Sequence, residues 1–315
     1  MRGLWLKNLT LFKLYNFPTG AASDLEDAFG KRHFNPCGTF ERESHGFAPA
    51  FGEQTLVRKT GDVYWAQVKS ERKLLPAAVV RKALDERIAE LEAQGRKVGR
   101  KYKRELKEEV GEAMLAKAFS VDSLLTVLID PIEQCLVIDT SSPKKAELVV
   151  SLLAACFSGI ELEMLEFDAS TVSKMTERLL AETADPTFSV DGTLLLKSPQ
   201  DTRQTVRFAN RDLGRPEVRA HLASGLAVAA LEFTWNARIN FVLTDPFSVR
   251  RVRFLEVVQE AVDVENDENA SEIIDAQLLL QSGELRGLLA DLMTWLERKP
   301  SATREGAAAR VAVAA

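Results

Sequence analysis

The spacing of apolar residues predicts the helices and strands of this chain, and the clearest pattern lies between residues 74 and 120. Apolar residues recur there at intervals of three and four, as in an amphipathic helix, at Val80, Leu84, Ile88 and Leu91. Pro76 suits the first turn of this helix because proline has no N–H to lose there, and Gly95 ends it. A second helix follows, with a thinner stripe at Leu106, Val110, Met114 and Leu115. We predict two antiparallel helices, a helical arm that projects from a body.

Alternating apolar residues elsewhere predict a strand-rich body. Strands are expected at 4–15, 57–58, 62–70, 162–167, 193–197, 205–209 and 226–235. Helices are expected at 23–29, 143–157, 171–182, 215–224 and 284–296. Phe34–Phe51 is rich in Gly, Pro and aromatic residues and is predicted to be a compact loop, and Asp185–Asp191 is predicted to be a loop as well.

Two apolar runs flank an Asp-Pro turn twice in the chain, in VLIDPIEQCLVI and in FVLTDPFSVRRVRF. Each pattern predicts a β-hairpin, the first with strands at 124–130 and 135–140 and the second at 238–244 and 249–254. Asp130 and Asp245 are interpreted as turn residues and not as paired catalytic carboxylates. The likeness of the two hairpins predicts an internal pseudo-repeat.

Together these elements predict an α+β fold, with a strand-rich central body, the projecting arm, a second smaller lobe and the pseudo-repeat. The length of 315 residues suits two domains or one elaborated domain. The central body is assigned to 1–75, 116–175 and 245–300, the arm to 76–115, the second lobe, or base, to 176–244, and a flexible tail to 301–315.

Composition and charge limit the function. The chain is 46% hydrophobic and 28% charged, which is typical of a soluble globular protein. Its net charge is −5, so binding to an anion requires cations gathered on one surface, and the acidic stretch Asp263–Glu272 indicates such segregation. Three cysteines without CxxC spacing favour a reducing cytoplasm. Because no signal-peptide pattern and no run of about 20 apolar residues is present, we expect a cytoplasmic protein without a membrane partner.

The connection between the two arm helices is a candidate binding site. Residues 96–104 contain one aromatic residue, no carboxylate and six cations, Arg96, Lys97, Arg100, Lys101, Lys103 and Arg104. Uncompensated like charges repel one another and need an anionic partner or full solvation. The segment is therefore either a polyphosphate-binding surface or a solvated hairpin tip, and the pattern leaves both open.

Three other groups of residues have alternative interpretations. Phe119, beside Lys117, is either a core residue at a helix end or an exposed aromatic at a subunit contact or against a base. Arg250–Arg253 alternates along a predicted strand, so Arg251 and Arg253 share one face, which by default is solvated. A second basic neighbourhood consists of Arg203, Arg207 and Arg211, with Asn210.

We find no sequence motif for catalysis. The chain lacks GxxxxGK[ST], GxGxxG, GxSxG and HExxH. His33, Cys37 and His45 lie close in sequence, but a structural zinc site normally needs four ligands, so we interpret them as loop residues. The prediction is a protein that is not an enzyme and that needs no metal or other cofactor.

Several collinear segments carry a family resemblance. They are LWLKNLTLFKL at the N-terminus, FNPCG, KLLPAAVVRKALDERIAELE, LKEEV, AFS and IDTSSPKKAE. With these segments the chain resembles the RdgC family of bacterial recombination-associated proteins. The resemblance extends to the C-terminal helix and is strongest up to about Phe157.

The resemblance implies a ring-shaped homodimer of two horseshoe-like subunits, with a positively charged hole that encircles duplex DNA. It implies binding to single- and double-stranded DNA with little sequence preference in the nucleoid. It also implies antagonism of the RecA recombinase by occupation of DNA, and leaves open whether RecA itself is contacted.

Position by position, the resemblance assigns DNA binding to the six cations of residues 96–104, and to Lys117 and Arg211. It assigns a dimer contact or wedge to Phe119 and Asn210. The family can show a lysine followed by glutamine where this chain has Asn210 and Arg211, so one positive charge is kept but displaced by one residue.

Two rival classes of function remain. One is a protein-interaction scaffold whose basic arm binds an acidic partner. The other is a nuclease, which would need clustered carboxylates for a metal ion, and no such cluster is visible in the sequence.

Overall fold

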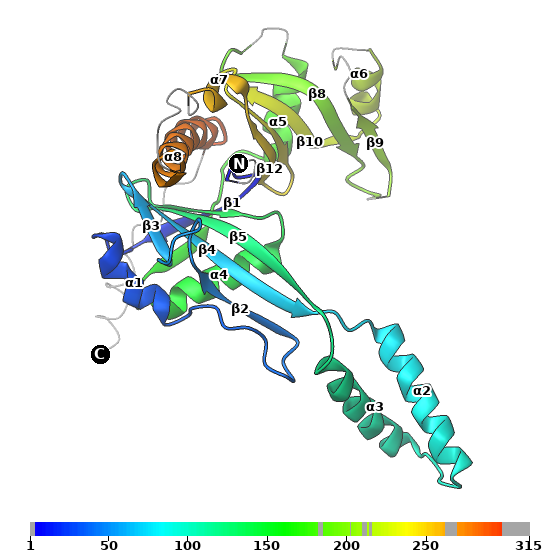
Figure 1. Ribbon diagram of the computed structural model, residues 1–315. Helices are drawn as coiled ribbons and strands as arrows, with labels where there is room; N and C mark the ends of the chain where they lie inside the picture. The colour runs from blue at the N-terminus through cyan, green and yellow to red at the C-terminus, as the bar shows by residue number, and fades with distance from the viewer. Residues whose placement is uncertain are drawn as a thin grey trace, which may run out of the picture. The chain divides into compact units, whose positions relative to one another are not determined.

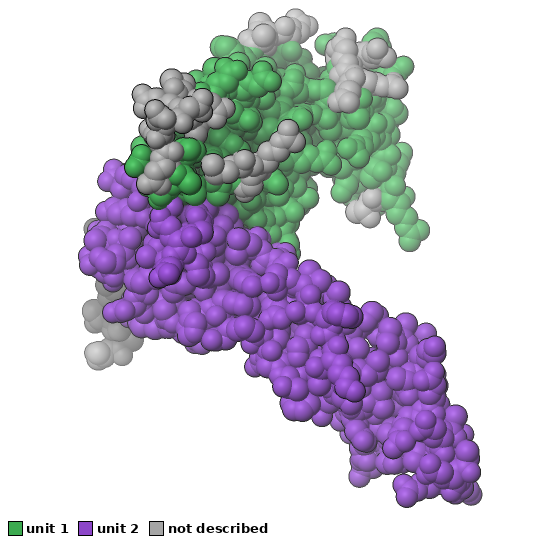
Figure 2. Space-filling model, viewed as in Figure 1, with its two compact units in different colours: residues 1–14, 132–143, 162–315 green, residues 15–131, 144–161 purple. Residues whose placement is uncertain are grey.

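A computed structural model describes residues 4–181, 185–201, 203–209, 213, 216–261 and 270–297. Over these residues the chain forms eight helices and twelve strands, which confirms the α+β class. The structure divides into two compact units, unit 1 with residues 1–14, 132–143 and 162–315 and unit 2 with residues 15–131 and 144–161 (Figure 2). No described helix combines the length and apolar composition needed to cross a membrane.

Unit 2 contains an antiparallel ladder of four strands. In it β4 (Val63–Lys73) lies between β5 (Ser120–Asp130) and β2 (Glu43–Ala48), and β3 (Val57–Thr60) also pairs with β4. The rings of Phe29, from α1 (Ala22–Gly30), and Phe157, which follows α4 (Pro143–Cys156), lie 5.2 Å apart. Trp65, Phe29 and Phe47 are fully buried and form the core of this unit.

The strand β2 corrects the prediction of an irregular Phe34–Phe51. Its residues pair with β4 from Glu43↔Arg72 to Ala48↔Gln67. Gly46 lies so close to the preceding segment that an added Cβ would be 2.6 Å from the backbone of His33. This contact explains why a glycine stands in the strand, and glycine is also what made the segment look irregular in sequence.

The two helices predicted for the arm are present in unit 2. They are α2 (Ala77–Ala93) and α3 (Arg100–Leu115), which lie side by side beyond the ends of β4 and β5 (Figure 1). The β4–β5 ladder ends at Lys73↔Ser120, and the Leu74 N–H then donates to the Phe119 carbonyl at 2.7 Å. The sheet therefore holds both chain ends of the helix pair.

Unit 1 contains a second run of antiparallel strands. Their order is β6 (Cys135–Asp139), β1 (Asn8–Tyr15), β12 (Ser248–Phe254), β11 (Ile239–Thr244), β10 (Ala227–Trp235), β8 (Phe188–Lys197) and β9 (Thr205–Phe208), and β7 (Glu161–Met164) also pairs with β1. Its helices are α5 (Thr171–Leu180), α6 (Pro216–Ala223), α7 (Glu256–Gln259) and α8 (Ala270–Trp295). The β8 strand begins at Phe188, inside the predicted Asp185–Asp191 loop, because Phe188 pairs with Trp235.

Helix α8 begins 14 residues before the predicted Glu284. Its first half contains Gln277 and Gln281, which are polar but buried. Gln281 accepts a hydrogen bond from the Leu6 N–H at 2.7 Å and donates to the Leu4 carbonyl at 3.3 Å. Because these bonds satisfy the amide, a polar residue occupies a core position that apolar periodicity could not reveal.

The arrangement of arginines on β12 differs from the prediction. Asn240 pairs with Arg253 and Val242 with Arg250, so the register shifts by one residue at Arg251, where φ is +52°. This is a β-bulge, and it interrupts strict alternation. Arg250 and Arg253, three residues apart, therefore share the face opposite buried Val249 and Val252. The prediction of a regular alternation that sets Arg250 apart from Arg253 is wrong, although Arg251 and Arg253 do line the same groove.

Candidate nucleic-acid interface

The helix pair of unit 2 is held together by a small apolar cluster. Leu84 and Leu91 of α2 and Leu106 of α3 are each less than 5% exposed. Ile88, Val98 and Val110 pack against them. All of these residues except Val98 belong to the apolar stripes predicted from the sequence, and Val98 lies in the connection between the two helices. The cluster fixes the two helices against each other and so positions the connection between them.

A defined turn ends α2. The Arg96 N–H donates to the Leu91 carbonyl and the Gly95 N–H to the Glu92 carbonyl, with Gly95 at φ +79°. This pair of bonds is the Schellman motif, in which glycine accepts the left-handed conformation without steric cost. Helix α3 then begins at Arg100, with Gly99 as its N-cap and no side-chain cap. The predicted helix end at Gly95 is confirmed.

The basic tip, residues 96–104, is almost entirely exposed. All six of its cations are exposed, and only Val98 is partly buried. Lys101 lies 4.0 Å from Glu105. No ion pair with another described residue is formed by Arg96, Lys97, Arg100, Lys103 or Arg104. The basic tip therefore presents five cations whose charge is balanced only by solvent.

The beginning of α3 concentrates this charge further. Arg100, Lys101 and Lys103 occupy its first turn, which contains no acidic residue. The N-terminus of a helix already carries about half a positive charge, together with N–H groups that lack intrahelical partners. Cations there are mildly destabilising unless an anion is close. The arrangement consequently favours phosphate or another anion at the tip.

Behind the tip, acidic residues are paired or mixed with cations. Glu90 lies 2.8 Å from Arg87, and this carboxylate raises the pKa of the Arg87 guanidinium. Lys82 lies 4.0 Å from Glu86 on the same helix. Residues 105–112 of α3 contain four glutamates and one lysine. The excess of positive charge is therefore confined to residues 96–104.

At the other end of the helix pair, Phe119 is 86% exposed. The interpretation of Phe119 as a core residue is wrong, because the side chain points away from the core although its backbone joins the β4–β5 ladder. Leu74 and Val121, on the neighbouring backbone, are also exposed large apolar residues. Lys117 is exposed as well. Asn210 and Arg211 lie outside the described residues.

The loop residues considered as metal ligands have ordinary contacts. His33 lies with Nδ1 3.0 Å from the Gly30 carbonyl, and the Cys37 N–H donates to the Glu71 carboxylate at 2.8 Å. Partial burial and the charge of Glu71 raise the pKa of the Cys37 thiol. Within the described ranges, no three or more His, Cys, Asp or Glu side chains gather as metal ligands would.

Comparison with known proteins gives one consistent result. Residues 4–299 match a family model described as "Putative exonuclease, RdgC". The chain is 36% identical over 296 residues to the recombination-associated protein RdgC of Janthinobacterium sp. (strain Marseille), covering 93% of this chain and 98% of that protein. It is 37% identical over 300 residues to the protein of the same name from Cupriavidus pinatubonensis, covering 94% and 100%. Over 299 residues it is 37% identical to the one from Laribacter hongkongensis, covering 93% and 98%.

Proposed function

Because the chain belongs to the RdgC family of recombination-associated proteins, we propose that it binds DNA without sequence preference through the basic tip. The observation that carries this proposal is the set of five exposed tip cations that form no ion pair with a described residue. Lys and Arg contacts to phosphate supply affinity that is independent of base sequence. Of the nine residues of the tip six are exposed Lys or Arg, the side chains that contact phosphate and position a protein on DNA without reading its sequence.

The proposal includes a homodimeric ring around DNA. The family resemblance supports it, and so does the exposed position of Phe119 beside Leu74 and Val121, because exposed apolar groups of this kind suit a subunit contact. In this proposal residues 76–115 act as an arm that reaches the duplex, and Lys117, Asn210 and Arg211 contribute near the subunit contact. Occupation of DNA by such rings would limit access of RecA to the nucleoid DNA.

Charge reversal at the start of α3 tests the role of the basic tip. Arg100→Glu with Lys101→Glu reverses two of its charges and places acidic residues in a helical first turn, where they stabilise the helix. We expect affinity for duplex and for single strands to fall by at least tenfold at low salt. Loss of binding could then not be ascribed to a melted helix.

The matched control is Lys144→Glu with Lys145→Glu. These two exposed lysines also lie in a first turn, that of α4, so the change in net charge and in helix dipole interaction is the same. Equal affinities of the two double variants would contradict the proposal. If the tip variant still binds DNA as the wild type does, the scaffold alternative, in which the arm binds an acidic protein, is favoured.

The ring is tested separately from the tip. Protein bound to a nicked circular plasmid and to the same plasmid after linearisation is challenged with high salt. Retention on the circle with loss from linear ends is expected, because a closed ring can leave only over an end. Equal loss from both substrates would show surface binding without encirclement.

The family description as an exonuclease gives a second candidate activity. Metal-dependent cleavage would need carboxylates gathered around an ion, and the described residues offer no such group. Labelled duplex incubated with the protein and Mg²⁺ or Mn²⁺ is therefore expected to stay intact. Cleavage that co-purifies with the wild-type chain and is absent from a blank preparation would replace the non-enzymatic proposal.

A further inference from the structure

A second basic surface lies on the sheet of unit 1. An open groove of about 680 Å³ is lined by residues from β1, β8, β9, β10 and β12 and by Lys7, just before β1. Four of the lining residues are cations: Lys7, Arg207, Arg251 and Arg253. The lining contains one carboxylate, Glu232. These cations are far apart in the sequence and come together only through strand pairing.

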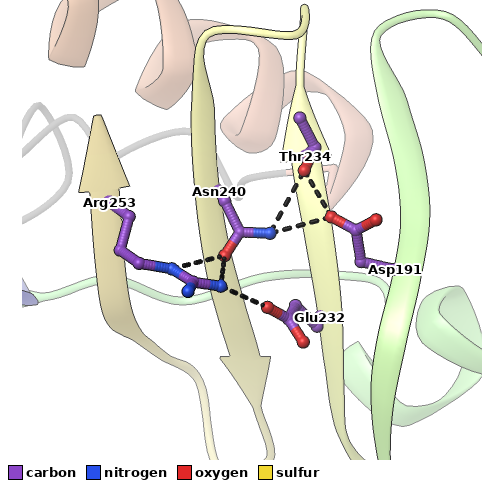
Figure 3. Close-up of polar contacts among 5 residues, drawn as sticks. All are labelled: Asp191, Glu232, Thr234, Asn240 and Arg253. Atoms are coloured by element: carbon purple, nitrogen blue, oxygen red, sulfur yellow. Dashed lines mark hydrogen bonds and ion pairs between the residues drawn. The ribbon is translucent and has the colours of Figure 1, made fainter. Parts of the chain in front are cut away.

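Arg253 is held in place by a polar network across four strands (Figure 3). Its Nε and Nη2 donate to Asn240 Oδ1 at 3.2 and 2.7 Å, and Nη2 also lies 2.8 Å from Glu232 Oε1. Asn240 and Glu232 are themselves nearly inaccessible, at 5% and 9% exposure. Two supporting groups on the sheet therefore fix the plane of the guanidinium.

The amide of Asn240 is oriented from its other side. Its Nδ2 donates to Asp191 Oδ2 at 2.8 Å and to Thr234 Oγ1 at 3.1 Å, and Thr234 Oγ1 donates to the same carboxylate. A carboxylate on one side and a guanidinium on the other leave Asn240 a single favourable orientation. Four partners are thus committed to holding one arginine, whose side chain is nevertheless 67% exposed.

The outer edge of this arginine remains available. Arg253 Nη1 forms no hydrogen bond with a described residue, although an Arg fork can bind a phosphate with two parallel bonds. Lys7, Arg207 and Arg251 are exposed and form no ion pair with a described residue. Since Glu232 is already paired with Arg253, the groove has three exposed cations that form no ion pair with a described residue, beside a fixed guanidinium.

From this placement we propose that the groove of unit 1 is a second nucleic-acid site, which takes consecutive phosphates of a strand on Lys7, Arg207, Arg251 and Arg253. A polymer is favoured over a single small anion because the cations are spread over β9, β12 and the residue before β1 in an open groove. This second site rests on the proposed function in one respect only, which is that the chain binds nucleic acid. It uses a different unit and different residues from the basic tip.

The adjoining groove supplies a local reporter. Trp5 lines it together with Lys7 and Arg253, and its ring packs 4.5 Å from that of Phe254. The basic tip contains no tryptophan. Trp65 and Trp235 are buried, and Trp295 packs against Phe188 and Phe233. An oligothymidylate strand that binds at unit 1 should therefore quench the tryptophan fluorescence of the protein. This quenching reports binding at unit 1 if it is lost in Trp5→Phe.

The test variant replaces Lys7, Arg207 and Arg251 by glutamine in the full-length chain. A control replaces Arg32, Lys144 and Lys145, three exposed cations of unit 2 away from the basic tip, in the same way. All six positions are exposed, so both variants are expected to fold. With three phosphate contacts removed, the slope of log K against log salt should become shallower by about 2 for a single strand. Quenching of Trp5 should be lost in the test variant and kept in the control.

Three results would overturn the proposal. One is a test variant whose slope and quenching equal those of the control. Another is quenching unchanged by Trp5→Phe. The third is full competition by thymidine monophosphate at the same phosphate concentration, which would mean a site for small phosphates and not for a strand. If instead the Arg100→Glu, Lys101→Glu variant binds normally while this test variant does not, the role of the basic tip fails and the unit 1 site stands.

Discussion

Truncation of Leu106 is the sharpest probe of the coupling between packing and binding in the helix pair. Leu106 is 3% exposed and belongs to a cluster with only two other buried residues, Leu84 and Leu91. Leu106→Ala removes most of a buried side chain and leaves a cavity, which typically lowers the free energy of unfolding by about 2–5 kcal/mol. The apolar side chains packed around this cluster, Ile88, Val98 and Val110, are only partly buried.

That cost is large relative to the stability of the α2–α3 helix pair. Helices of 17 and 16 residues are marginal in water on their own. A loss of about 2.8 kcal/mol changes the opening equilibrium about 100-fold. The strands β4 and β5 pair independently of the cluster, so the pair should open locally while the sheet stays folded. Apparent DNA affinity then falls in proportion to the closed fraction.

Hydrogen exchange and DNA binding, measured on the same samples, test this reasoning. We expect amides of residues 77–115 to lose protection, amides of β4 and β5 to keep it, and affinity for duplex to fall. Val79→Ala is the matched control, since Val79 lies on α2 but is 45% exposed. If the helices lose protection and duplex affinity stays at the wild-type level, the ordered tip is not the binding element and the reasoning is refuted.

Three further predictions follow from charge and burial. With six tip cations, the slope of log K against log salt for duplex should be about −5 when one subunit's tip is engaged and about −10 for two; a slope near zero in a binding titration would contradict the electrostatic account. Phe119→Ser should weaken self-association in sedimentation experiments without lowering the thermal stability of the subunit, because the ring is 86% exposed; unchanged association would remove Phe119 from the subunit contact. Burial raises the pKa of Asp139 although the N–H groups of Asn8 and Lys7 donate to it. A raised folded-state pKa contributes stability that is fully present below the unfolded value of about 3.9 and is lost as pH rises through the folded pKa. The wild-type free energy of unfolding, relative to Asp139→Asn, should therefore fall as pH rises from about 4, and denaturant titrations with a constant difference would contradict this.

Local signals in the sequence were sufficient for much of the fold. The stripes at Leu84, Leu91 and Leu106 predicted α2 and α3, because three- and four-residue spacing places apolar side chains on one helical face. Gly95 marked the end of α2 through its left-handed conformation. The Asp-Pro turns at Asp130 and Asp245 located the four strands around them. Each of these signals lies within a few residues of the structure that it specifies.

The failures share a different cause, which is pairing between distant segments. Gly46 is in a strand because β4 pairs with it and His33 lies against it, and neither contact is visible in ESHGFA. Gln281 occupies the core because the backbone of residues 4–6 bonds its amide. Arg251 is displaced by a bulge that depends on the register of β11. Periodicity treats each segment alone and so cannot anticipate such contacts.

The two basic surfaces illustrate the same difference. The tip was found from the sequence because its six cations are consecutive or nearly so. In unit 1, the sequence grouped Arg207 with Arg203 and Arg211, and Arg253 with Arg251, but no pattern connected these two groups with each other or with Lys7. Asn240 gave no signal at all, although it positions Arg253. Only the order of β1, β12, β11, β10, β8 and β9 brings these residues to one face.

Charge segregation along α3 explains how a chain of net charge −5 can offer cations to DNA. The basic tip ends at Arg104, and toward the sheet the helix continues with one lysine, Lys107, and four glutamates, Glu105, Glu108, Glu109 and Glu112. At 1.5 Å per residue, Glu112 lies about 12 Å along the helix from Arg104, beyond the Debye length of about 8 Å at physiological salt. Glu112 therefore acts only weakly on the field at the basic tip, whereas Glu105, Glu108 and Glu109 lie closer and offset part of it. All four repel phosphates from the rest of the helix pair. The acidic residues thus confine contact to the tip, and the overall negative charge of the chain is compatible with local binding of a polyanion.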